Sequence, residues 1–334
     1  MGTRSCGASA WNAEQIAAVF DPVKVGLDRV MDNLKGLAGR QSTFLSDLLD
    51  HVFEAPGKSI RPALTLLAAR FHSHDASKTE TMATAVELLH LATLIHDDTV
   101  DGSDVRRGKQ TINSLWGGNT AVLVGDYLFA ASATYVCDTG EIRVIRRFAE
   151  TIMELSSGEL QEMAAAYDSS QTVDQYMEIT YNKTASLFST AGESGAILSG
   201  ASEETVSALR DYSRNLGMAY QIVDDILDFN GSQDEVGKPV GNDLSQGKMT
   251  LPAMLAAQRD PDHNPIPGLF RSPDDPERLR RSVEMVQDPS VLDDAYSTAR
   301  GLCDQAIRSL RFLPQVPTRN SLEVLADYVM CRRR

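Results

Sequence analysis

The sequence predicts an all-α fold. Apolar residues recur every three or four positions over long stretches, as in residues 81–98, where Val86, Leu89 and Thr93 share one helix face with Asp97. No stretch shows the alternating pattern of a half-buried strand, and strong glycine and proline punctuation is sparse. The same helical period predicts further helices at 119–137, 141–166, 172–199, 203–229 and 288–312.

The clearest interruption of this pattern is PDHNPIPGLFRSPDDP at 261–276, which contains five of the thirteen prolines. We interpret it as a loop between helices, because the chemically suggestive residues all precede it and only amphipathic helix follows. A domain boundary is the alternative. We therefore expect a loose N-terminal arm over residues 1–12 and a single all-α domain over residues 13–334.

Composition restricts the classes of function. The formal charge of −14 argues against nucleic-acid binding, which needs a basic surface. The sequence has no long uninterrupted apolar run and no hydrophobic region of a signal peptide near its N-terminus, so we expect no transmembrane segment. The four cysteines are far apart and form no CxxC pair, so neither a zinc site nor a disulfide framework is predicted. We expect a cytoplasmic protein.

Asp97, Asp98 and Asp101 form a DDxxD cluster at the end of the helix over residues 81–98. On a helix, the i and i+4 positions place Asp97 and Asp101 on one face. Carboxylates one turn apart repel each other, and Mg²⁺ can neutralise them while it also binds phosphate oxygens and water. Taken alone, the cluster is equally typical of a solvated acidic helix end.

A second cluster repeats the DDxxD spacing at Asp224, Asp225 and Asp228, in QIVDDILDF. Its neighbours are apolar, and burying carboxylates among them is costly unless a metal ion or a basic group compensates. Two such clusters facing one cavity predict a site that holds a diphosphate through bridging metal ions.

Basic residues accompany both clusters. They are Lys58 and Arg61 in GKSIRP, Arg106 and Arg107 in DVRRGKQT, Lys183 next to Thr184 in YNKTASLF, and Lys238 and Lys248 in GKPVGNDLSQGKMTLP. Arginine binds phosphate through a planar fork and lysine as a point charge. Any one of them alone is typical of a surface charge, but together they predict two anion sites, one bound through metal ions and one bound directly.

In these motifs and their order, the sequence resembles the trans-type polyprenyl diphosphate synthases, and long-chain members such as octaprenyl, heptaprenyl or solanesyl diphosphate synthases in particular. The likeness covers most of the chain, from GKSIRPAL through ELLHLATLIHDDTVDGSDVRRGKQT, AVLVGDYLFA and YNKTASLF to QIVDDILDF and GKPVGNDLSQGKMTLP. It implies an all-α helical bundle around a deep central cavity, usually a homodimer, and a prenyltransferase activity.

The resemblance also implies roles for individual residues. The metal ligands, for about three Mg²⁺ ions per active site, are Asp97, Asp98, Asp101, Asp224, Asp225 and Asp228. The catalytic residues are Asp97, Asp98, Asp101, Arg106, Lys183, Asp224 and Asp225. Isopentenyl diphosphate is expected on Lys58, Arg61, His90 and Arg107. The allylic diphosphate is expected near Arg106, Lys183, Thr184, Gln221, Lys238 and Lys248.

The reaction that these roles imply starts with departure of the allylic diphosphate, whose developing charge the metal ions and cations stabilise. The double bond of isopentenyl diphosphate then attacks the allylic carbocation, and a proton is lost. We expect no side-chain general base. An apolar cavity excludes the water that would otherwise quench the cation.

In this family, the residues just upstream of the first DDxxD indicate the product length. Ala92 and Thr93 stand there, and neither is a bulky aromatic residue that would close the channel early. Leu89, Phe129 and Tyr135 are candidate floor residues further along the channel. We expect an all-trans product of roughly seven to ten isoprene units, as in quinone side chains; a geranylgeranyl or farnesyl diphosphate synthase is the shorter-chain alternative.

Three other possibilities remain open at this stage. A terpene cyclase shares the first acidic cluster, but here the second site is DDILD and basic residues for isopentenyl diphosphate are present. The chain could also be a subunit of a heteromeric synthase or a non-catalytic partner subunit. The final arginines are either a phosphate contact or a solvated tail, and we favour the tail. We expect at most a loose membrane association for product release.

Overall fold

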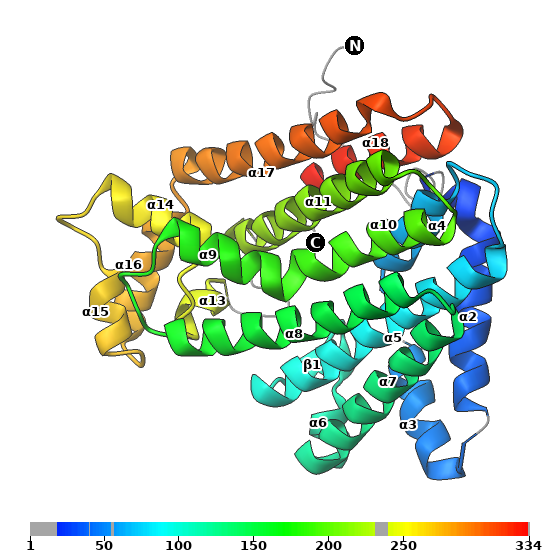
Figure 1. The fold of residues 1–334 in the computed structure, drawn as a ribbon. Helices are drawn as coiled ribbons and strands as arrows, with labels where there is room; N and C mark the ends of the chain where they lie inside the picture. Colours follow the sequence, from blue (N-terminus) through cyan, green and yellow to red (C-terminus); the bar gives the residue numbers. More distant parts are fainter. Residues whose placement is uncertain (1–18, 40, 55–56, 231–239, 333–334) are drawn as a thin grey trace.

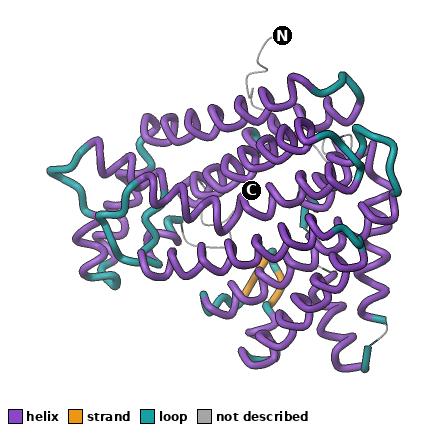
Figure 2. Tube along the Cα trace, viewed as in Figure 1, coloured by secondary structure: helices purple, strands orange, loops and turns teal. Residues whose placement is uncertain are grey.

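The structure is a computed structural model that describes residues 19–39, 41–54, 57–230 and 240–332 of the chain. Helices dominate these residues, which confirms the predicted fold class, and Figures 1 and 2 show them packed side by side in a bundle. The expected N-terminal arm over residues 1–12, Lys238 and the last two arginines lie outside the described residues.

Two long helices form the centre of the bundle. The elements of the first half are η1 (Asp21–Val23), α2 (Lys24–Ala38), α3 (Thr43–Phe53), α4 (Ile60–Ala69), α5 (Ala76–Val100), β1 (Val105–Arg106), β2 (Lys109–Gln110), α6 (Ile112–Trp116), α7 (Gly118–Asp138) and α8 (Ile142–Ala165). Among them α5 is the central helix, with Leu88 and Leu89 fully buried between α2, α4, α7 and α10.

The second half contributes α9 (Val173–Thr180), the π-helical turn η2 (Tyr181–Ala185), α10 (Ser186–Leu198), α11 (Glu203–Asn230), α13 (Asn242–Ser245), α14 (Leu251–Arg259), α15 (Ile266–Arg271), α16 (Pro276–Val286), α17 (Pro289–Ser309), η3 (Leu310–Phe312) and α18 (Pro317–Met330). Here α11 is the central helix, packed between α10 and α17. Figure 1 shows α8, α10, α11 and α17 crossing the view as successive layers.

Two details differ from the sequence-based expectation. The stretch 261–276 is not entirely loop, because it contains the short helix α15, whose Ile266 and Leu269 are buried. The predicted helix at 172–199 is divided by η2, a π-helical turn; such turns are frequent at functional sites. A buried apolar cluster extends from Val19 to Met330, so helices on both sides of 261–276 share one core.

A small hairpin follows α5 directly. Its strands pair Val105 with Gln110 and Arg106 with Lys109, which leaves Arg107 and Gly108 as the two-residue turn. Both turn residues have positive φ, 52° and 77°, as a type I′ hairpin turn requires. The turn therefore fixes the backbone direction of two adjacent arginines next to the first acidic cluster.

Candidate active site

A cleft of about 620 Å³ brings together residues that are far apart in the sequence. Its walls come from α4 and the segment before it, α5, the hairpin, η2, α11 and the end of the chain. The sequence-predicted residues that line it are Lys58, Arg61, His90, Thr93, Asp97, Asp101, Arg106, Arg107, Lys183, Thr184, Gln221 and Asp224. A smaller cavity of about 120 Å³ shares Lys183, Thr184 and Gln221 with it and adds Asp225 and Lys248.

The first acidic cluster lies at the C-terminal end of α5. Asp97 and Asp101 line the cleft, whereas the buried Asp98 accepts a hydrogen bond from Arg106 Nε at 2.6 Å. Burial raises the pKa of the Asp97 carboxyl to about 7, although Lys183 acts in the opposite direction. Negative charge at a helix C-terminus also opposes the helix dipole, so this end of α5 favours the approach of cations.

The second acidic cluster lies near the C-terminal end of α11, and its first two carboxylates face different cavities. Asp224 lines the large cleft, while the buried Asp225 lines the smaller cavity. Both oxygens of Asp225 accept hydrogen bonds, one from Tyr176 Oη at 2.5 Å and one from Gln221 Nε2 at 2.8 Å. Burial raises the pKa of Asp225 well above its ordinary value.

Asp228 is the third member of this cluster and is held from the following segment. It is buried, and its Oδ2 accepts the backbone N–H of Asp243 at 3.1 Å. Burial and then Asp228 raise the pKa of the Asp243 carboxyl to about 7. Asp243 therefore adds a further acidic group next to the second cluster.

The donor set can be tested against a divalent cation. No group of three or more His, Cys, Asp or Glu side chains within the described residues lies close enough to hold a metal ion by itself. Asp97, Asp101 and Asp224 nevertheless line one cleft, and burial raises the pKa of Asp97, so a cation bound beside it would favour the ionised carboxylate. Mg²⁺ usually takes one or two carboxylates plus substrate phosphate oxygens and water, so these residues fit an ion that binds together with a diphosphate.

The four residues predicted for isopentenyl diphosphate meet at one end of the cleft. Lys58 precedes α4, which begins at Ile60, whereas Arg61 lies in the first turn of that helix. Arg61 Nη1 lies 3.2 Å from His90 Nε2. Burial and then Arg61 lower the pKa of His90 well below its ordinary value, so the neutral ring accepts this hydrogen bond.

Two observations indicate that an anion fits at this end. Arg61 Nε is buried without a hydrogen-bond partner in the described residues. A Cβ atom at Gly57 would lie 2.8 Å from Arg107 Nη1, so the absence of a side chain there admits the Arg107 guanidinium. One buried carboxylate, Glu87, lines the same region, and burial raises its pKa, whereas Arg61 and Arg107 lower it.

The first of the three final arginines, Arg332, is buried, which corrects for this residue our expectation of a solvated tail. The Arg332 side chain is only 7% exposed, and its Nη2 lies 3.2 Å from Asp224 Oδ1. Its guanidinium stacks on the Tyr220 ring at 3.8 Å, and its Nε and Nη1 are buried without hydrogen-bond partners in the described part of the chain. The preceding Cys331 is disulfide-bonded, which cysteine spacing did not predict.

The lysines predicted for the allylic diphosphate are held by glutamates of α8. Lys183 Nζ lies 2.8 Å from Glu159 Oε2 and 2.6 Å from Glu162 Oε2. Lys248 Nζ lies 3.1 Å from the same Glu162 oxygen and 3.9 Å from Asp101 Oδ1. Burial would raise the pKa of Glu162, but Lys183 and Lys248 lower it below its ordinary value, so Glu162 is ionised at neutral pH.

The backbone explains why these side chains meet. A Cβ atom at Gly158 would lie 2.7 Å from the backbone nitrogen of Lys183, so only glycine lets α8 and η2 approach so closely. On the other side of η2, Thr184 Oγ1 donates to Gln221 Oε1 at 2.7 Å, which joins the turn to α11.

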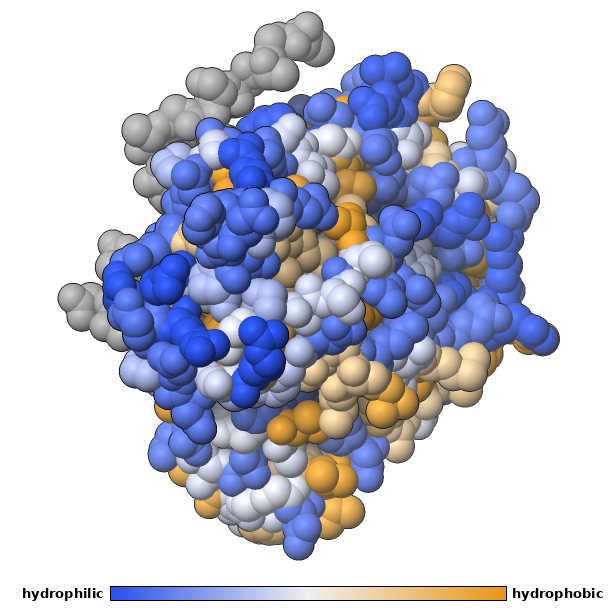
Figure 3. Space-filling model, turned by 90° about the vertical axis from the view of Figure 1, so that its left-hand side faces the viewer, coloured by the Kyte–Doolittle hydropathy of each residue, from blue (hydrophilic) through white to orange (hydrophobic). Residues whose placement is uncertain are grey.

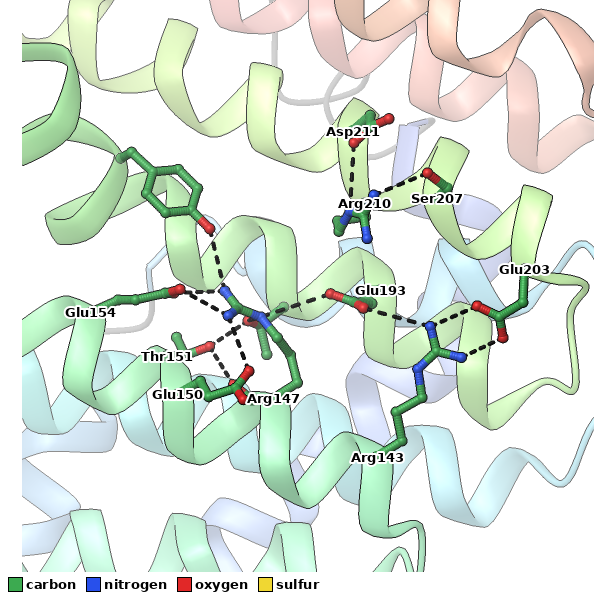
Figure 4. A network of polar contacts seen from close by, with 12 residues as sticks. Arg143, Arg147, Glu150, Thr151, Glu154, Glu193, Glu203, Ser207, Arg210 and Asp211 are labelled. Carbon is green, nitrogen blue, oxygen red and sulfur yellow. Dashed lines mark hydrogen bonds and ion pairs between the residues drawn. The ribbon is translucent and has the colours of Figure 1, made fainter. Parts of the chain in front are cut away.

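A polar network anchors the other half of α8 (Figure 4). Arg147 Nη1 and Nη2 donate to Glu154 at 2.9 and 2.6 Å, and its Nε donates to Thr190 on α10 at 3.1 Å. Figure 4 also shows Arg143 bridging towards Glu193 and Glu203 on the neighbouring helices. The helix that presents Glu159 and Glu162 is therefore fixed against α10 and α11.

The predicted chain-length residues differ in their exposure to the cleft. Thr93 lines the cleft, while Leu89 and Ala92 are fully buried and line neither cavity. Phe129 on α7 is partly buried, and its ring lies parallel to that of His96 at 6.1 Å.

Sequence reasoning missed several residues of this site: Glu87, Glu159, Glu162, Tyr176, Tyr220, Asp243 and Arg332. The pair Glu159 and Glu162 has helical spacing, but so does any solvated acidic face, and only the fold shows that it meets two lysines. Nothing in the sequence around Arg332 distinguishes a buried arginine from one in a solvated tail.

Comparison with known proteins relates the sequence to prenyl diphosphate synthases. The sequence is 35% identical over 323 residues to solanesyl-diphosphate synthase 2, chloroplastic, of Oryza sativa subsp. japonica, an alignment that covers 95% of this chain and 80% of the rice protein. It is 35% identical over 289 residues to heptaprenyl diphosphate synthase component 2 of Bacillus subtilis, with 86% of this chain and 83% of that protein covered.

The fold has close counterparts among solved structures. A polyprenyl synthase from Caulobacter crescentus CB15, complexed with calcium and isoprenyl diphosphate, superimposes with a TM-score of 0.90 at 32% identity and covers 99% of this chain and 100% of that one. The sequence model of the polyprenyl synthetase family matches residues 42–286. The chain therefore belongs to the polyprenyl synthetase family of prenyltransferases.

Proposed function

We propose that this chain condenses isopentenyl diphosphate head to tail onto an allylic diphosphate and releases a long-chain all-trans polyprenyl diphosphate. The observation that carries the proposal is that Asp97, Asp101 and Asp224 line the same cleft as a set of basic side chains. Such a cleft can hold two diphosphates, one through metal ions and one through direct contacts.

The acidic clusters divide into two roles. Asp97, Asp101 and Asp224 are the candidate Mg²⁺ ligands, because they line the cleft. Asp98 accepts a hydrogen bond from Arg106, Asp225 accepts from Tyr176 and Gln221, and Asp228 accepts from the Asp243 backbone. We propose that these three carboxylates act mainly by holding the walls of the cleft in place. Mg²⁺ bound with the allylic diphosphate neutralises the charge that develops on the departing group. The number of ions, for which we expect about three, is part of this proposal.

The basic residues bind and orient the two substrates. Lys58, Arg61, His90 and Arg107 form the isopentenyl-diphosphate site, to which Arg332 contributes its charge. Neutral His90 accepts from Arg61 and so orients the guanidinium rather than adding charge. At the other end, Lys183 and Lys248 face the allylic diphosphate together with Arg106, Thr184 and Gln221. The released diphosphate, rather than a side chain, accepts the proton that the condensed cation loses.

The product length that we propose is roughly seven to ten isoprene units, for use in a quinone side chain. Two features support it: no aromatic residue stands at Ala92 or Thr93, and the relatives named above are solanesyl and heptaprenyl diphosphate synthases. Thr93 lines the cleft, and its position supports the proposal that the growing chain extends past it.

The test is an elongation assay. The purified chain is incubated with Mg²⁺, labelled isopentenyl diphosphate and, in separate reactions, dimethylallyl, geranyl, farnesyl or geranylgeranyl diphosphate, and the products are sized after dephosphorylation. We expect products of seven or more units, and Thr93→Phe should shorten them without abolishing turnover. Wild-type products that stop at three or four units would overturn the proposed length, and the absence of any product would overturn the activity.

A second copy of the chain is the partner that we propose. By length and composition alone, the helix α7 is apolar enough to cross a membrane. Only 39% of its apolar stretch is buried inside the structure, so the rest of this stretch lies at the surface. Leu123 on α7 is 69% exposed and Leu160 on the neighbouring α8 is 66% exposed, which leaves an apolar face uncovered. Figure 3 shows apolar side chains gathered on the lower part of one side of the molecule. Covering such a face in a homodimer stabilises it.

The name of the Bacillus subtilis relative, component 2, favours a heteromeric alternative. A dimer of the purified chain that elongates alone supports the homodimer, whereas a monomer without activity supports the heteromer. We further propose a single domain over residues 13–334 and a cytoplasmic location, with at most loose membrane association.

A further inference from the structure

We propose that Glu162 is a positioning residue of the allylic-diphosphate site, whose carboxylate holds the ammonium groups of Lys183 and Lys248 together so that both address one diphosphate. The inference rests on the proposed function, which assigns these two lysines to that substrate.

The geometry is specific to one oxygen atom. Lys183 Nζ lies 2.6 Å and Lys248 Nζ 3.1 Å from Oε2 of Glu162. The two lysines come from different elements, because Lys183 belongs to η2 and Lys248 to the segment between α13 and α14. Within the described residues, Glu162 is therefore the side chain that brings the two ammonium groups to a common point.

Charge explains why such a side chain is needed. Two ammonium groups repel each other, and flexible lysine stems can move apart unless an anion lies between them. An ammonium group has three N–H donors, and Lys183 directs two of them to Glu159 and Glu162. One N–H donor is left for a diphosphate oxygen. The two glutamates therefore hold the Lys183 ammonium group in place without using all of its hydrogen-bond donors.

Glu162 itself is rigidly placed. Its side chain is 23% exposed, and it lies on the part of α8 that follows Gly158, where the helix approaches the backbone of η2. The network of Figure 4 holds the first half of the same helix through Arg147 and Arg143. The Glu162 carboxylate is thus held in place by the helix, and it forms ion pairs with two long lysine side chains.

Glu159 supplies a matched control. It lies one turn before Glu162 and contacts Lys183 Nζ at 2.8 Å, but it makes no ion pair with Lys248. Glu159→Gln therefore removes the same charge from the same helix and leaves the connection between the two lysines in place.

The experiment measures kcat and both KM values for the wild type, Glu162→Gln, Glu162→Asp and Glu159→Gln. We expect Glu162→Gln to raise KM for the allylic diphosphate by about tenfold or more, with KM for isopentenyl diphosphate changed less than about twofold. Glu162→Asp keeps the charge but is one methylene shorter, so its effect should be intermediate, and Glu159→Gln should have the smallest effect. In a Lys248→Gln background, the effect of Glu162→Gln should largely disappear.

The direction of the change is informative. Glu162→Gln removes a negative charge beside an anion site, so Coulomb attraction alone predicts tighter binding of the allylic diphosphate. Weaker binding is therefore specific to the loss of positioning. An unchanged or lower allylic KM would overturn the proposal, as would equal increases in both KM values, a lowered Tm with no selective effect, or full persistence of the effect with Lys248→Gln.

A binding measurement separates this inference from the proposed function. Calorimetric titration with inorganic diphosphate and Mg²⁺ should show weaker binding to Glu162→Gln than to Glu159→Gln, whether or not the chain elongates a primer. If the wild type elongates none of the primers, the proposed function is wrong, and a selective loss in this titration would still assign Glu162 to an anion site. Equal diphosphate binding by both variants would overturn the role of Glu162.

Discussion

The two acidic clusters have the same DDxxD spacing but different surroundings. The first lies at the C-terminal end of α5, next to a hairpin that brings in two arginines, and two of its three carboxylates line the large cleft. In the second, on α11, only Asp224 lines that cleft. Asp225 and Asp228 are buried and already accept hydrogen bonds, from Tyr176 on α9, from Gln221 on α11 and from the Asp243 backbone.

This difference shows that equal spacing does not imply equal roles. A carboxylate whose oxygens already accept hydrogen bonds has less capacity to bind a cation than one that faces an open cleft. The first cluster should therefore act mainly through metal binding. The second should act partly through Asp224 and partly by fixing the wall that α11, α9 and the Asp243 segment share.

The largest effect is expected for the first cluster. Asp97→Asn and Asp101→Asn should each lower kcat by about a thousandfold, because each removes a charge from the proposed metal site. Steady-state elongation with a fixed primer measures this loss, and excess Mg²⁺ should restore only part of it. Asp104→Asn is the matched control, since Asp104 is exposed on the same connection and does not line the cleft. More than a tenth of wild-type activity in Asp101→Asn would contradict the metal role.

Much of this site could be predicted from the sequence because its signals are local. The helical period marks α5 and α11, and the DDxxD spacing indicates how the carboxylates lie along each helix. Short motifs predict Arg61, Arg107 and Lys183 as basic residues of the site, and all three line the cleft.

The remainder depends on contacts between distant segments, which spacing cannot show. Nothing local in the sequence indicates that Tyr176 donates to Asp225, or that Arg332 reaches Asp224 from the other end of the chain. The hairpin turn at Arg107 and Gly108 was also missed, because arginine is an unusual residue at positive φ. These features arise from packing, and packing decides which carboxylates face the cleft.

The second cluster should show a graded response. We expect Asp224→Asn to lower kcat by about a hundredfold and Asp225→Asn by only about tenfold, because the second change removes a wall contact rather than a cleft carboxylate. Tyr176→Phe deletes the hydrogen bond to Asp225 but keeps the carboxylate, and it should cost less than about fivefold. Equal losses for Asp224→Asn and Asp225→Asn in the same elongation assay would remove the distinction between the two carboxylates.

The smallest effect is on stability, and it concerns Asp97 in the metal-free protein. Burial raises the pKa of Asp97 from its ordinary 3.8 to about 7, so between these values the folded protein keeps a proton that the unfolded chain has lost. The contribution of Asp97 to the free energy of unfolding therefore falls as pH rises through this window and is lowest above pH 7. Asp97→Asn, which stays neutral, should raise Tm at pH 8 by roughly 2–5 °C and change it little at pH 5.

Thermal unfolding in the presence of a chelator, at intervals from about pH 5 to pH 8, measures this difference between the two proteins. Asp243, whose pKa is also raised to about 7, titrates in both of them and cancels in the comparison. Added Mg²⁺ with inorganic diphosphate should stabilise the wild type more than Asp97→Asn, because only the wild type offers the carboxylate. If Tm depends on pH in the same way in the two proteins, burial does not raise the pKa of Asp97.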